Sequence, residues 1–476
     1  MLKPARHARC TTLNAVERRK FRHKRTSVIV SQEGFFNNYG SLAAIARRPL
    51  RHYPLPIMTS LEASGSRMGG VRFLGRRRSY ARLLARGAVL LMVSLGLYRF
   101  WLMTDVRRFL WASTEIDGET LEYAGTPFEL LLGFLVAIAV LVPIYAGFFI
   151  AALDLGVVGE LTGLAAFLGL AVLGQYAIYR ARRYRLTRTI FRGLRFTQDG
   201  SAWIYAIRAA SWWLLTALTL GLAYPFQLAS LERYKMRHTY YGTLPGRFAG
   251  AGWKLFLRGV PMWLLLVAPL ALSVAAFIEA VDWTALSNAV AQGGDDVMAR
   301  IEGGNPALGE VIVFAMLMVG LSVLLAVLLY PVFQAMVLRW WTAGLRFGEI
   351  EAASSLRIRH VYGAYMRFLW WGLLFTVVLG VLAIPLLIAI GALAGKLPDS
   401  GAGDIAASLV GLGGYVIAAL GYSTIYRATV QLSLWQLGAE ALHLIGVERL
   451  DRVEARGEAS SPLGEGLADA LNVGGY

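Results

Sequence analysis

Long uncharged, largely apolar runs dominate the chain. Seven of them reach or pass the roughly 18 residues that mark a candidate membrane-spanning helix. They cover residues 130–153, 161–179, 209–231, 259–278, 311–338, 368–395 and 405–426. A shorter run at 87–98 ends at Arg99. This pattern predicts an all-α polytopic membrane protein and excludes a water-soluble enzyme and a disordered chain.

Positive charge is concentrated at the N-terminus. Residues 1–86 hold 19 of the 47 Lys and Arg but only 3 of the 30 acidic residues. This imbalance predicts a cytoplasmic anchor, because short basic segments stay on the cytoplasmic side of a membrane. We expect residues 1–69 to form a basic, mostly disordered arm, of which 1–57 could be an over-long start before Met58. The single cysteine, Cys10, excludes an internal disulfide framework.

Charge in the connections predicts the topology. The loops 180–208, 232–258 and 339–367 carry eight, six and five Lys or Arg, whereas the connections 154–160, 279–310 and 396–404 carry none, one and one. Eight full spans would place one basic loop outside. We therefore predict six spans and two short re-entrant or interfacial segments, 87–104 and 209–231, with eight spans as the alternative. Both chain ends are then cytoplasmic.

The two short segments resemble each other. A shift of 125 residues superimposes one on the other without a gap. The superimposed motif residues are Leu95, Gly96, Leu97 and Arg108 in the first copy, and Leu220, Gly221, Leu222 and Arg233 in the second. We expect internal repeats, which are common in transporters but do not by themselves imply transport.

The repeats define the expected domain organisation. Repeat 1 covers 70–195, repeat 2 covers 196–338, and a degenerate repeat 3 covers 339–435. Residues 436–476 are expected to form a cytoplasmic helix and a mobile tail. Small cytoplasmic β-hairpins are predicted at 113–123, where polar and apolar residues alternate around Asp117-Gly118, and at 239–248.

The segment Leu95–Phe109 resembles the signature of the YjgN-like bacterial inner-membrane proteins, which carry a domain of unknown function. Thr219–Pro225 is its second copy, and Ser94 departs from the family's core Thr. The resemblance implies a location in the bacterial inner (plasma) membrane. It implies no reaction.

Polar residues and prolines within the apolar runs are the candidate functional positions. Arg99 stands out because a charge inside a membrane segment suggests a function. Glutamines that could line a polar cavity or join helices are Gln175, Gln227, Gln334 and Gln431. Candidate helix kinks are Pro143, Pro225, Pro269 and Pro385.

No catalytic or metal-binding motif is present in the sequence. We therefore expect no enzyme activity and no cofactor. The expected partners are the lipid bilayer and anionic lipid headgroups at the basic loops, without nucleic acid; the oligomeric state is open.

Two functions remain open. Repeats, kinked spans and polar residues favour a transporter or channel for a small solute. The lack of ordered charge pairs favours a non-catalytic membrane scaffold or envelope-organising protein. A continuous polar cavity would favour the first, and a dry bundle with an apolar groove the second.

Overall fold

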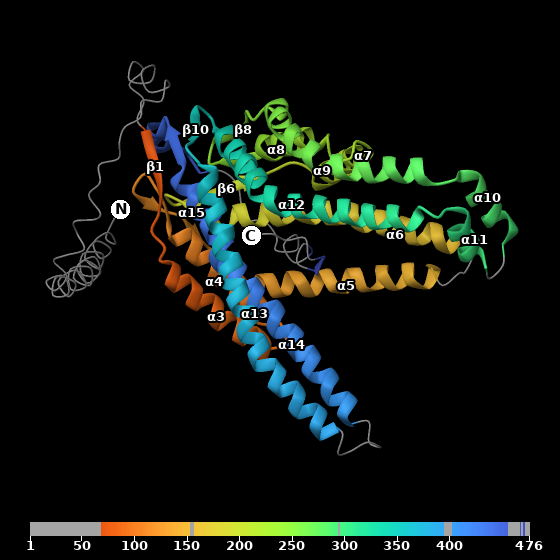
Figure 1. Ribbon diagram of the computed structural model, residues 1–476. Helices are drawn as coiled ribbons and strands as arrows, with labels where there is room; N and C mark the ends of the chain where they lie inside the picture. Colours follow the sequence, from red (N-terminus) through yellow and green to blue (C-terminus); the bar gives the residue numbers. More distant parts are fainter. Residues whose placement is uncertain are drawn as a thin grey trace, which may run out of the picture. The chain divides into compact units, whose positions relative to one another are not determined.

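The computed structural model describes residues 68–152, 157–293, 296–394 and 402–455, together with Leu467, Ala470 and Leu471 (Figure 1). The chain divides into two units, residues 1–65 and 66–476, and all described residues belong to the second. The predictions for the basic arm and for most of the C-terminal tail fall outside the described residues.

Six long helices are the main elements of the described chain. They are α5 (Pro127–Ala152), α6 (Val157–Thr187), α9 (Gly252–Ala280), α12 (Leu308–Gly344), α13 (Ile358–Ala394) and α14 (Ala402–Tyr426). They pack in pairs, α5 with α6, α9 with α12, and α13 with α14. Six helical segments, one overlapping each of these helices, are long and apolar enough to cross a membrane.

Short helices complete the helical part. Before α5 and before α9 the chain forms a hairpin of two short helices. The short helices are α3 (Arg77–Val93), α4 (Arg99–Ala112), α7 (Ala202–Leu218) and α8 (Tyr224–Arg237), with α10 (Trp283–Gln292) and α11 (Val297–Gly304) between α9 and α12. The π-helix η3 (Arg427–Gln431) and α15 (Leu432–Glu440) continue α14.

The prediction of an all-α protein with only small hairpins is wrong, because the strands join into one 11-stranded antiparallel sheet. The strands are β1 (Met68–Phe73), β2 (Thr114–Ile116), β3 (Glu119–Thr120), β4 (Glu122–Tyr123), β5 (Thr189–Phe191), β6 (Leu194–Gln198), β7 (Thr239–Tyr241), β8 (Leu244–Phe248), β9 (Leu345–Phe347), β10 (Ile350–Ser354) and β11 (Leu442–Ile445). Their order is β3-β2-β1-β11-β10-β9-β8-β7-β6-β5-β4.

This order makes the sheet nearly a closed ring. Every strand pairs with its neighbours in sequence except that β3 and β4 do not pair with each other, and β1 pairs with β11. The two edge strands, β3 and β4, are separated in the chain only by Leu121. Closure leaves few unpaired strand edges, which removes a surface prone to aggregation.

The sheet escaped prediction because its strands are short and lie in polar loops. Only 113–123 carries a strong turn signal. The β5–β6 turn at Arg192-Gly193 has the same positive φ pattern as Asp117-Gly118, but Arg is an unusual residue there. Pairing between distant strands, such as Met68 with Ile445, leaves no trace in local periodicity.

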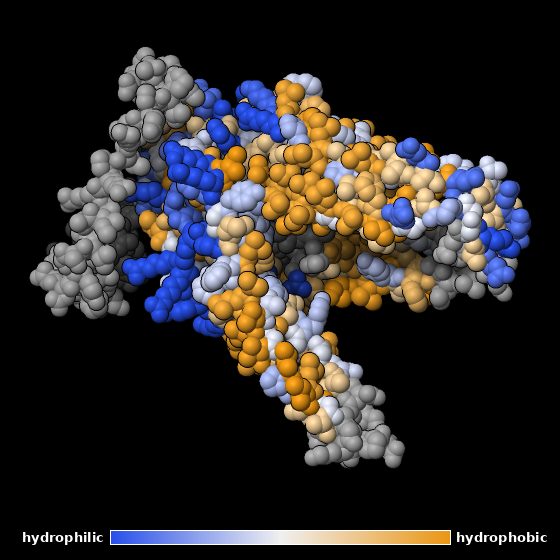
Figure 2. Space-filling model, viewed as in Figure 1, coloured by the Kyte–Doolittle hydropathy of each residue, from blue (hydrophilic) through white to orange (hydrophobic). Residues whose placement is uncertain are grey.

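All three Arg-rich loops enter this one sheet. The loop 180–208 contributes β5 and β6, 232–258 contributes β7 and β8, and 339–367 contributes β9 and β10. Figure 2 shows hydrophilic side chains gathered over the strands and again over α10–α11, with hydrophobic side chains covering the helices between them. The polar and apolar surfaces are thus separated along the helix axes.

The predicted C-terminal helix is shorter than expected. The α15 helix ends at Glu440, and Leu442–Ile445 pairs with both β10 and β1 instead of continuing as helix. The apolar residues of this segment are therefore recruited by the two neighbouring strands.

Candidate functional site

The turn between α7 and α8 is the tip of the second short hairpin. The α7 helix ends at Leu218, and the chain reverses through Leu220 and Gly221, whose φ angles are 49° and 92°. The amide of Gly221 donates to the carbonyl of Thr216 at 2.7 Å. A left-handed pair of this kind ends a helix abruptly, so the uncharged run 209–231 is two helices and not one span.

Pro225 is not a kink. It lies in the first turn of α8, where a missing backbone N–H costs little and the fixed φ suits helix initiation. Pro143, Pro269 and Pro385 do lie inside long helices, in α5, α9 and α13.

One buried hydrogen bond holds the two short helices together below this tip. The hydroxyl of Thr216 in α7 donates to the side-chain oxygen of Gln227 in α8 at 2.8 Å. Gln227 is only 2% exposed. A buried amide is stable only with such partners, so Gln227 acts here as a joint between helices.

An apolar cavity of about 330 Å³ lies beside the tip, between α7–α8, α9 and α12. The indole N–H of Trp263 in α9 donates to the carbonyl of Leu220 at 2.8 Å and so fastens the tip to the cavity wall. The lining residues are Thr216, Gly221, Leu222, Tyr224, Pro225, Phe256, Gly259, Val260, Met262, Trp263, Leu266, Ala326, Leu329, Tyr330 and Phe333.

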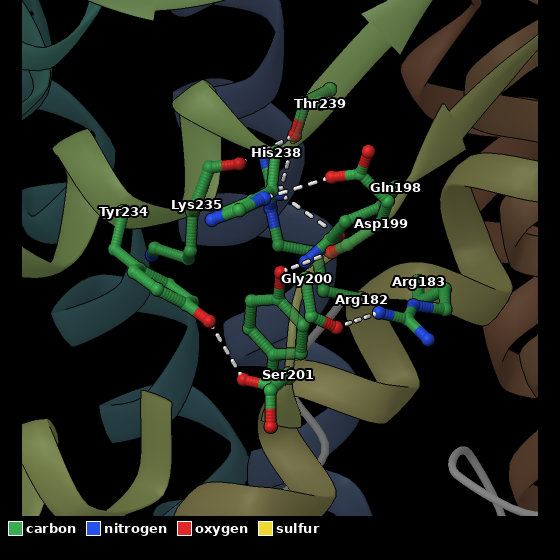
Figure 3. Close-up of polar contacts among 11 residues, drawn as sticks. Arg182, Arg183, Gln198, Asp199, Gly200, Ser201, Tyr234, Lys235, His238 and Thr239 are labelled. Carbon is green, nitrogen blue, oxygen red and sulfur yellow. Dashed lines mark hydrogen bonds and ion pairs between the residues drawn. The ribbon is translucent and has the colours of Figure 1, made fainter. Parts of the chain in front are cut away.

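The opposite ends of α7 and α8 meet in a polar cluster at the sheet (Figure 3). The hydroxyl of Tyr179 in α6 donates to the carbonyl of Asp199 at 2.6 Å, and that of Tyr234 in α8 donates to the carbonyl of Ser201 at 2.8 Å. The His238 ring lies 2.8 Å from the Asp199 carboxylate. These contacts fasten the start of α7 to the end of α8.

Two arginines of α6 extend the cluster. Arg182 donates to the side-chain oxygen of Gln198 at 3.0 Å and to the hydroxyl of Thr239 at 2.9 Å. Arg183 donates to the carbonyl of Gly200. Because β6 and β7 supply the acceptors, one helix end is locked onto two adjacent strands.

A half-buried ion pair lies next to this cluster. Lys235 contacts the carboxylate of Glu232, which also accepts a hydrogen bond from the Trp341 indole at 3.2 Å. Burial lowers the pKa of the Lys235 ammonium, and the Glu232 carboxylate opposes this shift. The pair links α8 to α12 through the Trp341 indole.

The structure does not bring the predicted glutamines together. Gln175 lies in α6, Gln227 is used between α7 and α8, Gln334 accepts from Tyr365, and Gln431 lies in the π-helix. None of them lines the apolar cavity.

Arg99 begins α4 directly after the first tip. Its guanidinium lies 5.7 Å from the ring centroid of Phe100 and 5.5 Å from that of Phe134. Stacking on aromatic rings suits a cation close to a membrane surface.

The motif residues occupy equivalent places in the two short hairpins. Leu95 and Gly96 have φ angles of 50° and 92°, nearly those of the second tip. Arg108 donates to the carbonyl of Gly125 at 3.1 Å, as Arg233 donates to that of Gly250 at 3.4 Å.

Sequence reasoning missed the cavity and the polar cluster. Tyr179, Tyr330 and His238 belong to no recognisable motif in the sequence. The helices and turns that bring these residues together are far apart in the chain, so no spacing rule could reveal them. Among the described residues, no group of three or more His, Cys, Asp or Glu side chains could hold a metal ion.

Comparisons with known proteins leave the site's chemistry open. A search of curated proteins finds no match, and a search of solved structures finds none either. A family model described as a bacterial protein of unknown function (DUF898) matches residues 69–470, so the chain belongs to this family, the YjgN family that its sequence resembles.

Proposed function

We propose that the chain is a non-catalytic scaffold of the bacterial inner membrane, in which a cytoplasmic sheet holds three helical hairpins in the bilayer. The main support for this proposal is that the candidate spans are little buried by one another. In the 18-residue apolar stretch that identifies each candidate span, only 0–11% of the residues are buried. A solute path within one chain needs helices packed around it, whereas helices that face outward are suited to lipid and to neighbouring membrane proteins.

Charge supports the orientation. The three basic loops all enter the sheet, and the positive-inside rule therefore favours a cytoplasmic sheet. Since β1 and β11 are adjacent strands, the chain leaves the described fold on the cytoplasmic side at both ends. Anionic lipid headgroups are the expected partners of this basic side.

The short hairpins are re-entrant in this proposal. The amide of Asp199 donates to the carbonyl of His238 at 2.9 Å, so both ends of α7–α8 lie on one side. The tips carry exposed apolar residues; Leu95 is 94% exposed and Leu220 is 71% exposed. Exposed leucines at a tip are favourable only in an apolar medium.

An internal duplication accounts for both hairpins. The two copies have helices of 17 and 14 residues in the same order, separated by the same left-handed turn. The first copy is followed by three strands and the second by two, and a long helix comes next in both. Equal lengths and equal turns are what a duplicated segment would retain.

Transport of a small solute is the function that the sequence favoured first, and it needs a polar cavity near the membrane midplane. The cavity beside the second hairpin tip is apolar, and the four glutamines are dispersed. In proteoliposomes we expect potassium, sugars and amino acids to cross no faster than in protein-free vesicles. Saturable uptake that is lost in Gln227→Leu would contradict the scaffold proposal.

Cross-linking gives a positive test. A photoreactive residue at Val381, which is 64% exposed in α13, should yield discrete protein adducts in native membranes. The matched control is Val361 in the same helix, which is fully buried and should yield no intermolecular adduct. Adducts to lipid alone at Val381 would overturn a scaffold role.

A further inference from the structure

The apolar cavity opens within the band of hydrophobic side chains. Its walls come from α9 and α12, two candidate spans, and from the tip of α7–α8. The lining residues of α9, Phe256 to Leu266, all lie in the half of that helix nearer to the sheet. Any occupant therefore enters from the leaflet on the sheet side.

The cavity suits one hydrocarbon chain. Its volume of about 330 Å³ is at the lower end of the range of about 300–1,000 Å³ typical of ligand sites. Apolar and aromatic side chains form its walls, and the hydroxyl-bearing rings of Tyr224 and Tyr330 are among them. An apolar wall with a few hydroxyls favours an amphiphile over a polar solute.

A row of cations leads to the cavity along α9. Lys254, Arg258, Met262 and Leu266 follow at intervals of four residues, which places them on one ridge of the helix. The two cations are exposed, and the two apolar residues line the cavity. With a rise of about 1.5 Å per residue, Arg258 lies roughly 12 Å from Leu266 along the axis.

This arrangement matches the two ends of a lipid. A phosphate at the membrane surface would lie near Lys254 and Arg258, while an attached acyl chain would run inward along Met262. In the described residues, no carboxylate forms an ion pair with Arg258, so its charge is available to a headgroup.

We propose that this cavity binds one acyl chain of an anionic phospholipid, with the phosphate held by Lys254 and Arg258. The site rests on the proposed orientation of α9 in the membrane and is independent of whether the protein acts as a scaffold. It assigns a ligand class to the second hairpin tip, which Trp263 holds in place.

Native mass spectrometry of the purified full chain tests the proposal. The probes are phosphatidylglycerol and phosphatidylcholine with identical acyl chains, and soluble glycerol phosphate. We expect the first phosphatidylglycerol molecule to bind with an affinity about tenfold or more above that of phosphatidylcholine. Glycerol phosphate should not bind, because it lacks the chain that fills the cavity. Equal affinity for the two lipids, or binding of glycerol phosphate, would overturn the proposal.

Filling the cavity should abolish this first binding event. Gly259→Phe places a ring in the cavity from α9, where an added Cβ would meet no atom within 4 Å. Ala326→Phe fills it from α12 and serves if the first variant does not fold. Gly320→Phe is the matched control, an exposed position of α12 outside the cavity, also without a neighbour within 4 Å. Unchanged lipid binding in both cavity variants would show that the cavity is not the site.

Removing the cations tests the headgroup contacts separately from the acyl-chain contacts. Lys254→Gln with Arg258→Gln should reduce phosphatidylglycerol affinity to that of phosphatidylcholine, whereas Arg339→Gln, an exposed cation of α12, should not. A double variant that keeps its preference would contradict the role of these cations. Solute uptake would overturn the scaffold without affecting this result, so the two failures are distinguishable.

Discussion

At the scale of single residues, Arg192 joins the two ends of the sheet. From the β5–β6 turn its guanidinium lies 3.2 Å from Asp117 and 3.5 Å from Glu119, which belong to the opposite end of the strand order. It also lies 2.7 Å from Asp451. Three carboxylates around one half-buried guanidinium form a network, which stabilises more than isolated surface pairs do.

Arg192→Ala should therefore lower the free energy of unfolding by about 1–3 kcal/mol, because it leaves the half-buried Asp117 without its cation. Thermal unfolding in detergent measures this loss, and hydrogen exchange should rise in β2, β3 and β5. The control is Arg72→Ala, which removes a single pair between an exposed guanidinium and Glu115 and should change stability by less than about 0.5 kcal/mol. Equal effects of the two variants would show that Arg192 does not close the sheet.

At the scale of helices and turns, the two hairpin tips have the same backbone geometry. Gly96 and Gly221 both have a φ of 92°, and each follows a leucine near 50°. The hydroxyl of Thr219 accepts from the amide of Ala223 at 3.1 Å, and that of Ser94 accepts from the amide of Tyr98 at 2.9 Å. The serine that departs from the expected threonine thus keeps the same hydrogen bond.

Gly96→Ala and Gly221→Ala should each lower stability by a similar amount, about 1–2 kcal/mol, because only glycine adopts this φ without strain. An added Cβ meets open space at Gly96 and only the Trp263 nitrogen at 3.9 Å at Gly221, so the effect reports backbone strain. Gly163→Ala, in open space inside α6, should be neutral or slightly stabilising. Melting temperatures of the three variants decide this, and a large difference between the two tips would contradict their equivalence.

The spans of the whole molecule could be predicted from the sequence, and the sheet could not. Runs of some 20 apolar residues identify a spanning helix by themselves, and unequal Arg content predicts that 209–231 returns to its own side. Strands of two to six residues such as Leu442–Ile445 carry too little local signal. The helix ends hold these loops close together, and this determines which strands pair.

The candidate site, too, could be predicted from the sequence only in part. The sequence singled out Leu220 and Gly221 only as repeat-motif residues, and the structure shows that they form the hairpin tip. The cavity beside the tip depends on Trp263 and Phe333, two ordinary aromatic residues of distant helices. The glutamines are candidate functional residues because polar residues are rare in spans. In the structure, Gln227 and Gln334 form hydrogen bonds between helices.

The basic arm should be dispensable for the membrane fold. A chain that begins at Met58 keeps β1, all six candidate spans and the arginines at 72, 76–78, 82 and 86 that favour a cytoplasmic start. We expect normal insertion, measured as the membrane-bound fraction after carbonate extraction. Loss of that fraction would assign the arm a role in insertion.

The topology itself is tested most directly by cysteine accessibility. Single cysteines replace the exposed residues Arg195, Thr243 and Thr284 in a Cys10→Ala background. A membrane-impermeant thiol reagent should label only the Thr284 position in spheroplasts, and only the Arg195 and Thr243 positions in inverted vesicles. This result places the sheet, and with it both ends of α7–α8, in the cytoplasm. Labelling of either sheet position in spheroplasts would contradict the account.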